Sequence, residues 1–200
     1  MSIIKLNNRA VKDATAVGSI TGLGNLVFIS RSTASSSSSL SITSGIDSTY
    51  KEYIFFFNNI HASTQAHFQV NFSADGGSNY NVTKTTTFFF ASHTETGSDT
   101  SLSYQGSFDL AQSTSAQPLG LSFSSDSDAG GSGYMHLFDP SNTTFVKHFL
   151  SVVGGFTDSD YYNTNYVGGY NNTTSAINAV QFSMASGNID SGTIDMYGVL

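Results

Sequence analysis

The sequence predicts an all-β protein: a single antiparallel β-sandwich, jelly-roll-like, preceded by a short extended N-terminal arm. Apolar residues with helical periodicity are almost absent after residue 17. Instead, short β-branched or aromatic runs recur about every 8 to 14 residues, separated by Gly, Asn, Asp and Ser. Since no helix-length segment lies between these runs, an antiparallel sandwich or barrel is favoured over βαβ units.

Residues 1–24 differ from the rest and are assigned to the arm, with the sandwich over residues 25–200. Lys5, Arg9 and Lys12 are the charged residues of the first twelve, which leaves 4 basic and 14 acidic residues for the rest of the chain. These three side chains are candidates for docking on an acidic partner or a neighbouring subunit. Local variation in charge is the simpler alternative.

The predicted strands follow in order from the arm, each bounded by turn-forming residues. The clearest is residues 67–74, where Phe68, Val70 and Phe72 alternate with polar residues, as in a strand with one face in water. The triplets at 55–57 and 88–90 instead put Phe on both faces, so we expect a loop, the arm or another copy of the chain to cover part of the outer face. The predicted strands are residues 25–30, 39–43, 50–60, 67–74, 83–93, 101–105, 118–123, 134–139, 144–153, 166–170, 176–184 and 192–199.

Composition fits one domain plus an arm. Only 10% of the 200 residues are charged, whereas 13% are aromatic, including 16 Phe, which predicts a phenylalanine-rich core. The net charge of -7 argues against nucleic-acid binding. The chain has no cysteine, and no apolar run has the length of a leader or a membrane span, so we expect neither.

No catalytic, cofactor-binding or metal-binding motif occurs in the sequence, so we expect a non-enzymatic protein without a cofactor. The five histidines are scattered, and no GxSxG, P-loop or GxGxxG pattern is present. Asp126 and Asp128 imitate the start of a calcium loop, although the twelfth position is Leu137 instead of Glu. A calcium-binding loop and a carboxylate pair for glycoside hydrolysis remain open as alternatives.

The best recognition candidate is the segment 158–174, predicted as a loop or interface rich in Tyr and Asn. Tyrosine offers a broad amphipathic surface at a small entropic cost, as antibody paratopes show. Packing of alternate tyrosines in an ordinary strand is the plainer interpretation, and a glycan platform is a further one. The candidate residues are Tyr161, Tyr162, Tyr166 and Tyr170.

Four stretches carry a resemblance to a known family: IKLNNRAVKDATA near the start, SADGGSNYNVTKTTTFFFA, MHLFDPSNTTFVKHF, and the ending NTTSAINAVQFSMASGNIDSGTIDMYGVL. Over nearly its whole length the chain resembles small β-rich virion structural proteins of tailed bacteriophages, notably marine ones. The shared motifs are those of a fold and its turns, so the resemblance implies a virion component and brings no active-site residues with it.

The resemblance implies a structural protein at the virion surface, assembled in the host cytoplasm. We expect it to bind other virion proteins through the arm and to form a homo-oligomer, with a trimer favoured. A capsid decoration or head-fibre protein is preferred, because no shaft of repeats precedes the sandwich. The alternatives are a tail fibre, tail adaptor or receptor-binding protein that recognises host surface glycan, and a carbohydrate-binding module or depolymerase.

Overall fold

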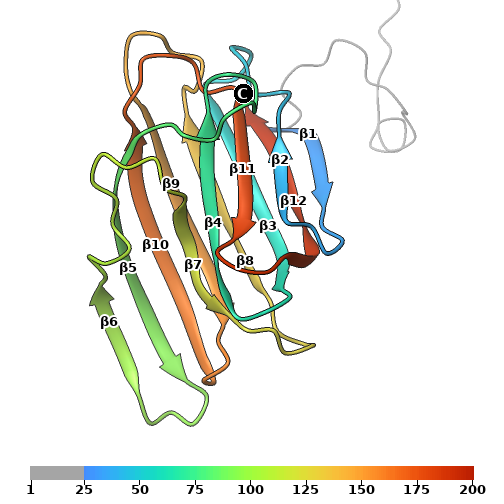
Figure 1. Ribbon diagram of the computed structural model, residues 1–200, viewed down its shortest axis with the longest axis vertical. Coiled ribbons are helices and arrows are strands. Elements are labelled where there is room, and N and C mark those ends of the chain that lie inside the picture. The colour runs from blue at the N-terminus through green and yellow to red at the C-terminus, as the bar shows by residue number, and fades with distance from the viewer. Residues whose placement is uncertain (1–24) are drawn as a thin grey trace, which may run out of the picture.

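Two antiparallel β-sheets, packed face to face, make up the part of the protein that the computed structural model describes, residues 25–200 (Figure 1). The predicted all-β sandwich is therefore confirmed. The proposed arm, with Lys5, Arg9 and Lys12, lies outside the described residues.

One sheet has eight strands and the other has four, and all neighbouring strands are antiparallel. Each of the predicted strands overlaps one observed strand. In spatial order the large sheet contains β1 (Leu26–Thr33), β12 (Ile189–Val199), β3 (Glu52–Ala62), β8 (Gly131–Phe138), β9 (Lys147–Phe156), β10 (Tyr161–Asn171), β5 (Lys84–Thr94) and β6 (Thr100–Tyr104). The small sheet contains β2 (Ser39–Ile42), β11 (Ala179–Met184), β4 (Ala66–Ser73) and β7 (Gln117–Phe123).

The large sheet extends beyond the small one. Strand β7, at the edge of the small sheet, packs over β9 and β10, and in Figure 1 the strands β5 and β6 lie to the left of it with no strand in front. Residues 105–113 continue the edge of the large sheet above β6, through backbone hydrogen bonds between Gln105 N and Phe88 O and between Lys84 N and Ser113 O. We call the part formed by β5, β6 and the first residues of β10 the overhang.

Phenylalanine fills the space between the sheets, as the composition predicts. Phe57 of β3 meets Phe68 of β4 edge to face at 5.1 Å between ring centroids, and Phe182 of β11 at 5.2 Å. Phe68 and Phe182 are stacked at 5.8 Å, and all three rings are buried. Because an aromatic pair contributes about 0.5–1.5 kcal/mol beyond area burial, this cluster binds the two sheets strongly together.

Phe123, at the end of β7, occupies a niche that three glycines leave open. A Cβ atom would come within 2.5 Å of its ring at Gly120, 2.1 Å at Gly131 and 2.3 Å at Gly155. Gly131 and Gly155 face each other on β8 and β9, so the buried ring of Phe123 lies directly against the backbone of the large sheet. This contact fixes where the edge of the small sheet lies.

We predict that Gly131→Ala lowers the free energy of unfolding by about 1–3 kcal/mol, because the added methyl group overlaps the Phe123 ring in a close-packed core. Gly106→Ala is the matched control, since its Cβ would meet only the Tyr104 ring at 3.7 Å. Urea denaturation measures both. Equal stability of the two variants would contradict a rigid niche around Phe123.

Two lysines are fully buried on the inner face of the large sheet. Lys84 and Lys147 flank Asn171 in register, one on either side. The Lys84 ammonium donates to Asn71 Oδ1 at 2.7 Å and to Val82 O at 3.0 Å, both uncharged acceptors. Burial lowers the pKa of Lys84 from 10.5 to about 8.

This lowered pKa predicts a pH-dependent stability. Between about pH 8 and 10.5 the folded protein has released the Lys84 proton while the unfolded chain retains it, so the free energy of unfolding rises with pH in this window. The rise approaches about 3 kcal/mol, because one pKa unit corresponds to 1.36 kcal/mol. Urea denaturation from pH 7 to 10.5 should show the full rise in the wild type and in Lys51→Met, whose lysine is exposed, and a smaller rise in Lys84→Met, which retains Lys147, whose pKa burial also lowers. A rise in Lys84→Met as large as that in the wild type would contradict the assignment.

Candidate functional site

The outer face of the large sheet carries an unbroken row of aromatic and apolar side chains. Directly paired residues of adjacent strands point to the same side of a sheet, so the register identifies the row. From β6 across to β3 it consists of Tyr104, Phe89, Tyr166, Val152, Tyr134 and Phe56. We call these residues the aromatic row.

Ring stacking and an ion pair order this row. Phe89 and Tyr166 stack at 4.8 Å between centroids with an interplanar angle of 6°. Past Phe56 the row ends at Asp195 of β12 and Arg31 of β1. The Arg31 guanidinium donates hydrogen bonds from Nε and Nη2 to the two carboxylate oxygens of Asp195, each at 2.6 Å. Hydrogen bonding to Asp195 raises the pKa of Arg31, so the pair closes the row with no net charge.

A second row runs beside the first and is also mainly apolar. Its central residues are Leu150, His136 and Ile54, and it ends in Tyr197 and Phe28, whose rings meet at 5.4 Å. The outer face thus presents apolar side chains from one edge of the sheet to the other.

Most of the exposed large apolar side chains of residues 25–200 lie on this outer face. Leu102 and Tyr104 of β6 are the most open, at 77% and 62% exposed. Only Phe145 and Leu200 lie elsewhere. The set on the outer face is Leu26, Phe28, Phe89, Leu102, Tyr104, Tyr134, Leu150 and Tyr162.

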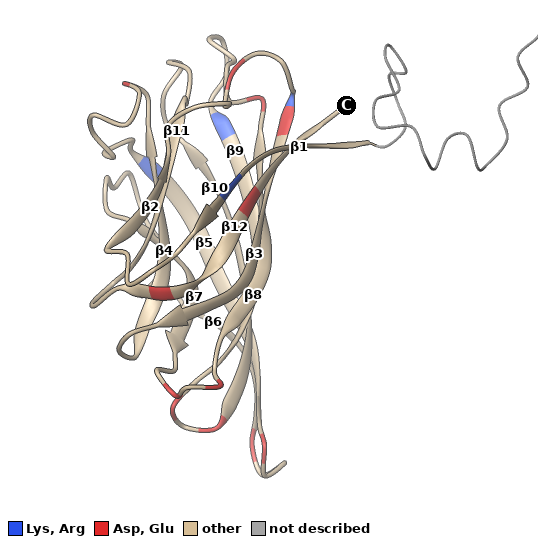
Figure 2. Cartoon of the chain, turned by 90° about the vertical axis from the view of Figure 1, so that its right-hand side faces the viewer, with Lys and Arg blue, Asp and Glu red and all other residues tan. Residues whose placement is uncertain are grey.

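Charge is concentrated away from the outer face. Besides the pair between Arg31 and Asp195, the face carries Glu52, which is hydrogen-bonded to His136, and two further histidines, His93 and His148. At its edge the Asp109 carboxylate accepts a hydrogen bond from the Tyr104 hydroxyl. Figure 2 shows most of the acidic residues on the connecting loops. Two copies of this acidic protein therefore meet little electrostatic repulsion if they approach through the outer face.

All four candidate tyrosines lie on strand β10: Tyr166 and Tyr170 belong to the predicted strand 166–170, whereas Tyr161 and Tyr162 were expected in a loop, and that part of the prediction is wrong. The Asn- and Gly-rich sequence favours a turn, but pairing with β5 and β9 on either side keeps the segment extended. Because side chains alternate along a strand, Tyr162, Tyr166 and Tyr170 point outward, whereas Tyr161 points to the inner side of the overhang. The structure thus divides the four candidates between two surfaces.

Sequence reasoning missed the contributions of β6, β8 and β9 to the outer face. Tyr104, Tyr134 and Leu150 each occur in an ordinary strand, and nothing local marks them as surface residues. The available signal was the pair of triplets at 55–57 and 88–90, which placed aromatics on both faces of two strands. Assembly of the eight strands in register joins these positions into one surface.

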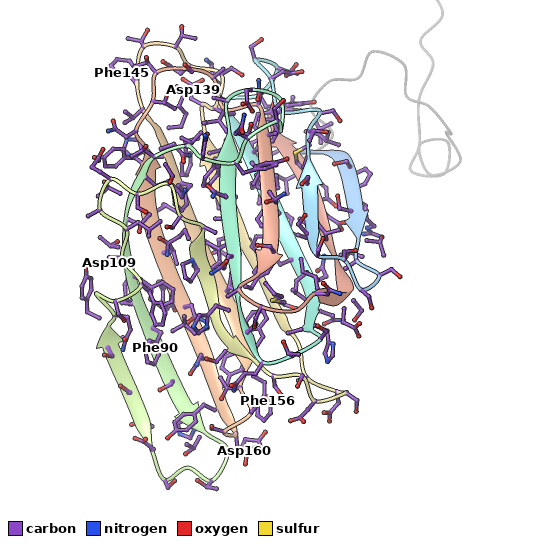
Figure 3. The ribbon with its side chains drawn as sticks, viewed as in Figure 1. Phe90, Asp109, Asp139, Phe145, Phe156 and Asp160 are labelled. Carbon is purple, nitrogen blue, oxygen red and sulfur yellow. The ribbon has the colours of Figure 1, made fainter. Side chains whose placement is uncertain are left out.

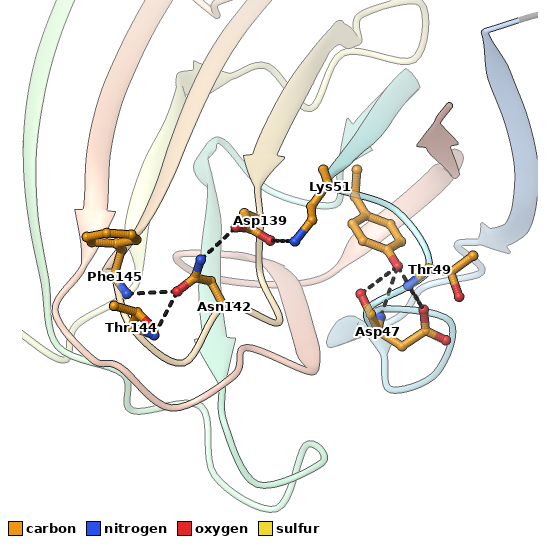
Figure 4. Close-up of polar contacts among 8 residues, drawn as sticks. Asp47, Thr49, Lys51, Asp139, Asn142, Thr144 and Phe145 are labelled. Carbon is orange, nitrogen blue, oxygen red and sulfur yellow. Dashed lines mark hydrogen bonds and ion pairs between the residues drawn. The ribbon is translucent and has the colours of Figure 1, made fainter.

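Phe145 is exposed for a different reason. It belongs to the turn between β8 and β9, where Asn142 Oδ1 accepts hydrogen bonds from the amides of Thr144 and Phe145 at 2.7 and 2.8 Å (Figure 4). The Asn142 amide donates to Asp139 at 2.8 Å, and Asp139 pairs with Lys51. These contacts lower the pKa of Asp139, that with Asn142 most. The ordered turn holds the 69% exposed Phe145 beyond the strand ends.

Residues 25–200 contain the loop with Asp126 and Asp128 that the sequence suggested as a calcium site. This loop lies beside His61, whose Nε2 is 3.0 Å from Asp126 O, and beside Asp190, at 3.6 Å from His61 Nδ1. Within residues 25–200, however, no three His, Asp or Glu side chains are grouped so that they could hold a metal ion.

Comparisons with known proteins add no information about the candidate site. No family model, curated protein or solved structure matches the chain. Nor does any helix in residues 25–200 have the length and apolar character needed to cross a membrane.

Proposed function

We propose that this chain is a non-enzymatic structural protein of the tailed-phage virion surface, a capsid decoration or head-fibre protein that works as a homo-oligomer. A trimer is the expected state, and residues 1–24 are the proposed attachment to other virion proteins. The outer face of the large sheet is the observation that carries the proposal, and the sequence resemblance supplies the virion context.

We also propose that the sandwich is a jelly roll with an inserted extension. A jelly roll winds eight strands so that the first pairs with the last, the second with the seventh, and so on inward. If β5, β6, β9 and β10 are left out, the remaining eight strands follow this rule. Their order is then β1-β12-β3-β8 in one sheet and β2-β11-β4-β7 in the other. The four strands left out enlarge one sheet and with it the outer face. Viral capsid proteins are among those built on jelly rolls.

A second copy of the chain is the partner that fits the outer face best. The eight exposed side chains on it present on the order of 800 Å², taking about 200 Å² for a fully exposed large side chain. Spread over the whole face, this exposed area is comparable to the roughly 800 Å² that one partner buries in a standard interface. The face is also nearly free of uncompensated charge, whereas the loops of each copy are acidic.

We predict that the purified protein is an oligomer and that the double variant Leu102→Ser with Leu150→Ser is a folded monomer. Both side chains are exposed on the outer face, so their replacement removes intersubunit contacts without opening the core. Phe145→Ser, which alters an exposed apolar residue off this face, is the matched control. Light scattering after size exclusion gives the mass, and mass spectrometry of purified particles gives incorporation.

The proposal expects the wild type and Phe145→Ser to assemble and to enter particles, and the double variant to do neither. A monomeric wild type would contradict assembly through the outer face. An oligomer that never enters particles would contradict the virion role.

A further inference from the structure

A second surface lies on the opposite side of the large sheet, where the overhang passes beyond the small sheet. A hollow of about 290 Å³ opens there between β7, β10 and β5. Ser92 of β5 and Asn163 of β10 face each other across the strand pair on its floor. Phe90, labelled in Figure 3, and Tyr161 supply two rings, and Ser122 of β7 closes one side. We call this hollow the inner groove.

The side chains that line the inner groove are all uncharged and mostly polar. Five carry hydroxyl groups, two carry amides, and Phe90 is purely apolar. Asn163 is 9% exposed and lines the groove, and no described residue forms a hydrogen bond with its side-chain amide. Solvent in the groove reaches this amide, so a ligand that enters can replace water as its hydrogen-bond partner.

The backbone beside the groove is held in conformations that L-residues rarely adopt. Ser122 has φ of 51° although it lies within a strand, and Asp160, next to Tyr161, has φ of 58°. The Ser122 amide donates to His67 Nδ1 at 2.9 Å, and burial lowers the pKa of His67, which favours the neutral ring that this bond requires. Such strain costs on the order of 1–3 kcal/mol and concentrates at ligand sites.

The surroundings of the groove select against anions. Tyr161 donates its hydroxyl to Asp99 Oδ2 at 2.8 Å, and Asp160 and Glu95 belong to the adjoining turns, joined by a backbone hydrogen bond. Figure 2 shows Asp and Glu but no Lys or Arg on the loops at this end of the sandwich. Phosphates and acidic sugars would be repelled, whereas a neutral ligand would not.

We propose that the inner groove binds a neutral saccharide. A sugar ring needs both donors and acceptors for its hydroxyls, which the amides and hydroxyls of the groove supply, and it stacks its C–H face on aromatic rings such as Phe90 and Tyr161. The volume lies at the small end of ligand sites and suits one or two sugar rings. This inference goes beyond the assembly role: the groove is on the face opposite the aromatic row and stays open in an oligomer built through that row.

Saturation-transfer NMR on the full chain tests this with the methyl glycosides of glucose, galactose, mannose and N-acetylglucosamine, and with glucuronate as the charged comparison. We expect saturable binding of at least one neutral glycoside with Kd of about 1 mM. Ser92→Phe should weaken it about tenfold or more by filling the groove. Asn163→Ala, which removes only the free amide, should weaken it about threefold to tenfold. Ser41→Phe, on the distant strand β2, is the matched control and should bind as the wild type does.

No saturable binding of any neutral glycoside would overturn the proposal, as would binding of glucuronate alone. Binding that both Ser92→Phe and Asn163→Ala leave unchanged would place the sugar elsewhere and would also overturn it. Light scattering on the same samples separates this result from the assembly proposal, because neither groove variant alters the outer face. A loss of binding together with an unchanged oligomer supports the groove, whatever the outcome for the virion role.

Discussion

The packing of phenylalanine rings between the two sheets determines how the small sheet sits on the large one. Phe57, Phe68 and Phe182 join the sheets at their centre, and Phe123 sets the edge of the small sheet against glycine backbone of β8 and β9. Because the small sheet ends there, the strands β5 and β6 project beyond it. Both surfaces follow from this offset: the inner groove beneath the overhang, and a wide outer face on its other side.

Because side chains alternate along each strand, the two faces of the large sheet carry chemically different side chains. On β10, Asn163 and Tyr161 point to the groove while Tyr162 and Tyr166 point outward, so a single strand serves both. The outer surface is aromatic, large and nearly neutral, which favours a protein partner of the same kind. The inner surface is small, concave and rich in hydroxyls, which favours a small polar ligand. One chain could therefore assemble through one face and bind through the other.

The fold was predictable from sequence because strand patterns are local. The alternation at 67–74 and the Phe triplets identified strands, and the abundance of Phe identified the core. The two sites were less predictable because each is formed by residues of different strands, which only the register between those strands brings together. Tyr134, Val152 and Tyr166 are far apart in sequence and adjacent only across β8, β9 and β10. Within segment 158–174 only residues 166–170 were predicted as a strand, because the composition before them suggests a loop, whereas pairing with β5 and β9 extends β10 back to Tyr161.

We propose that copies of this protein meet through the outer face of the large sheet on a phage particle. Cryo-electron microscopy of the particle tests it most directly. We expect density for the sandwich at the particle surface, with Leu102, Tyr104 and Leu150 in van der Waals contact with a neighbouring copy. Absence of the chain from the particle, or an outer face open to solvent in every copy, would contradict it.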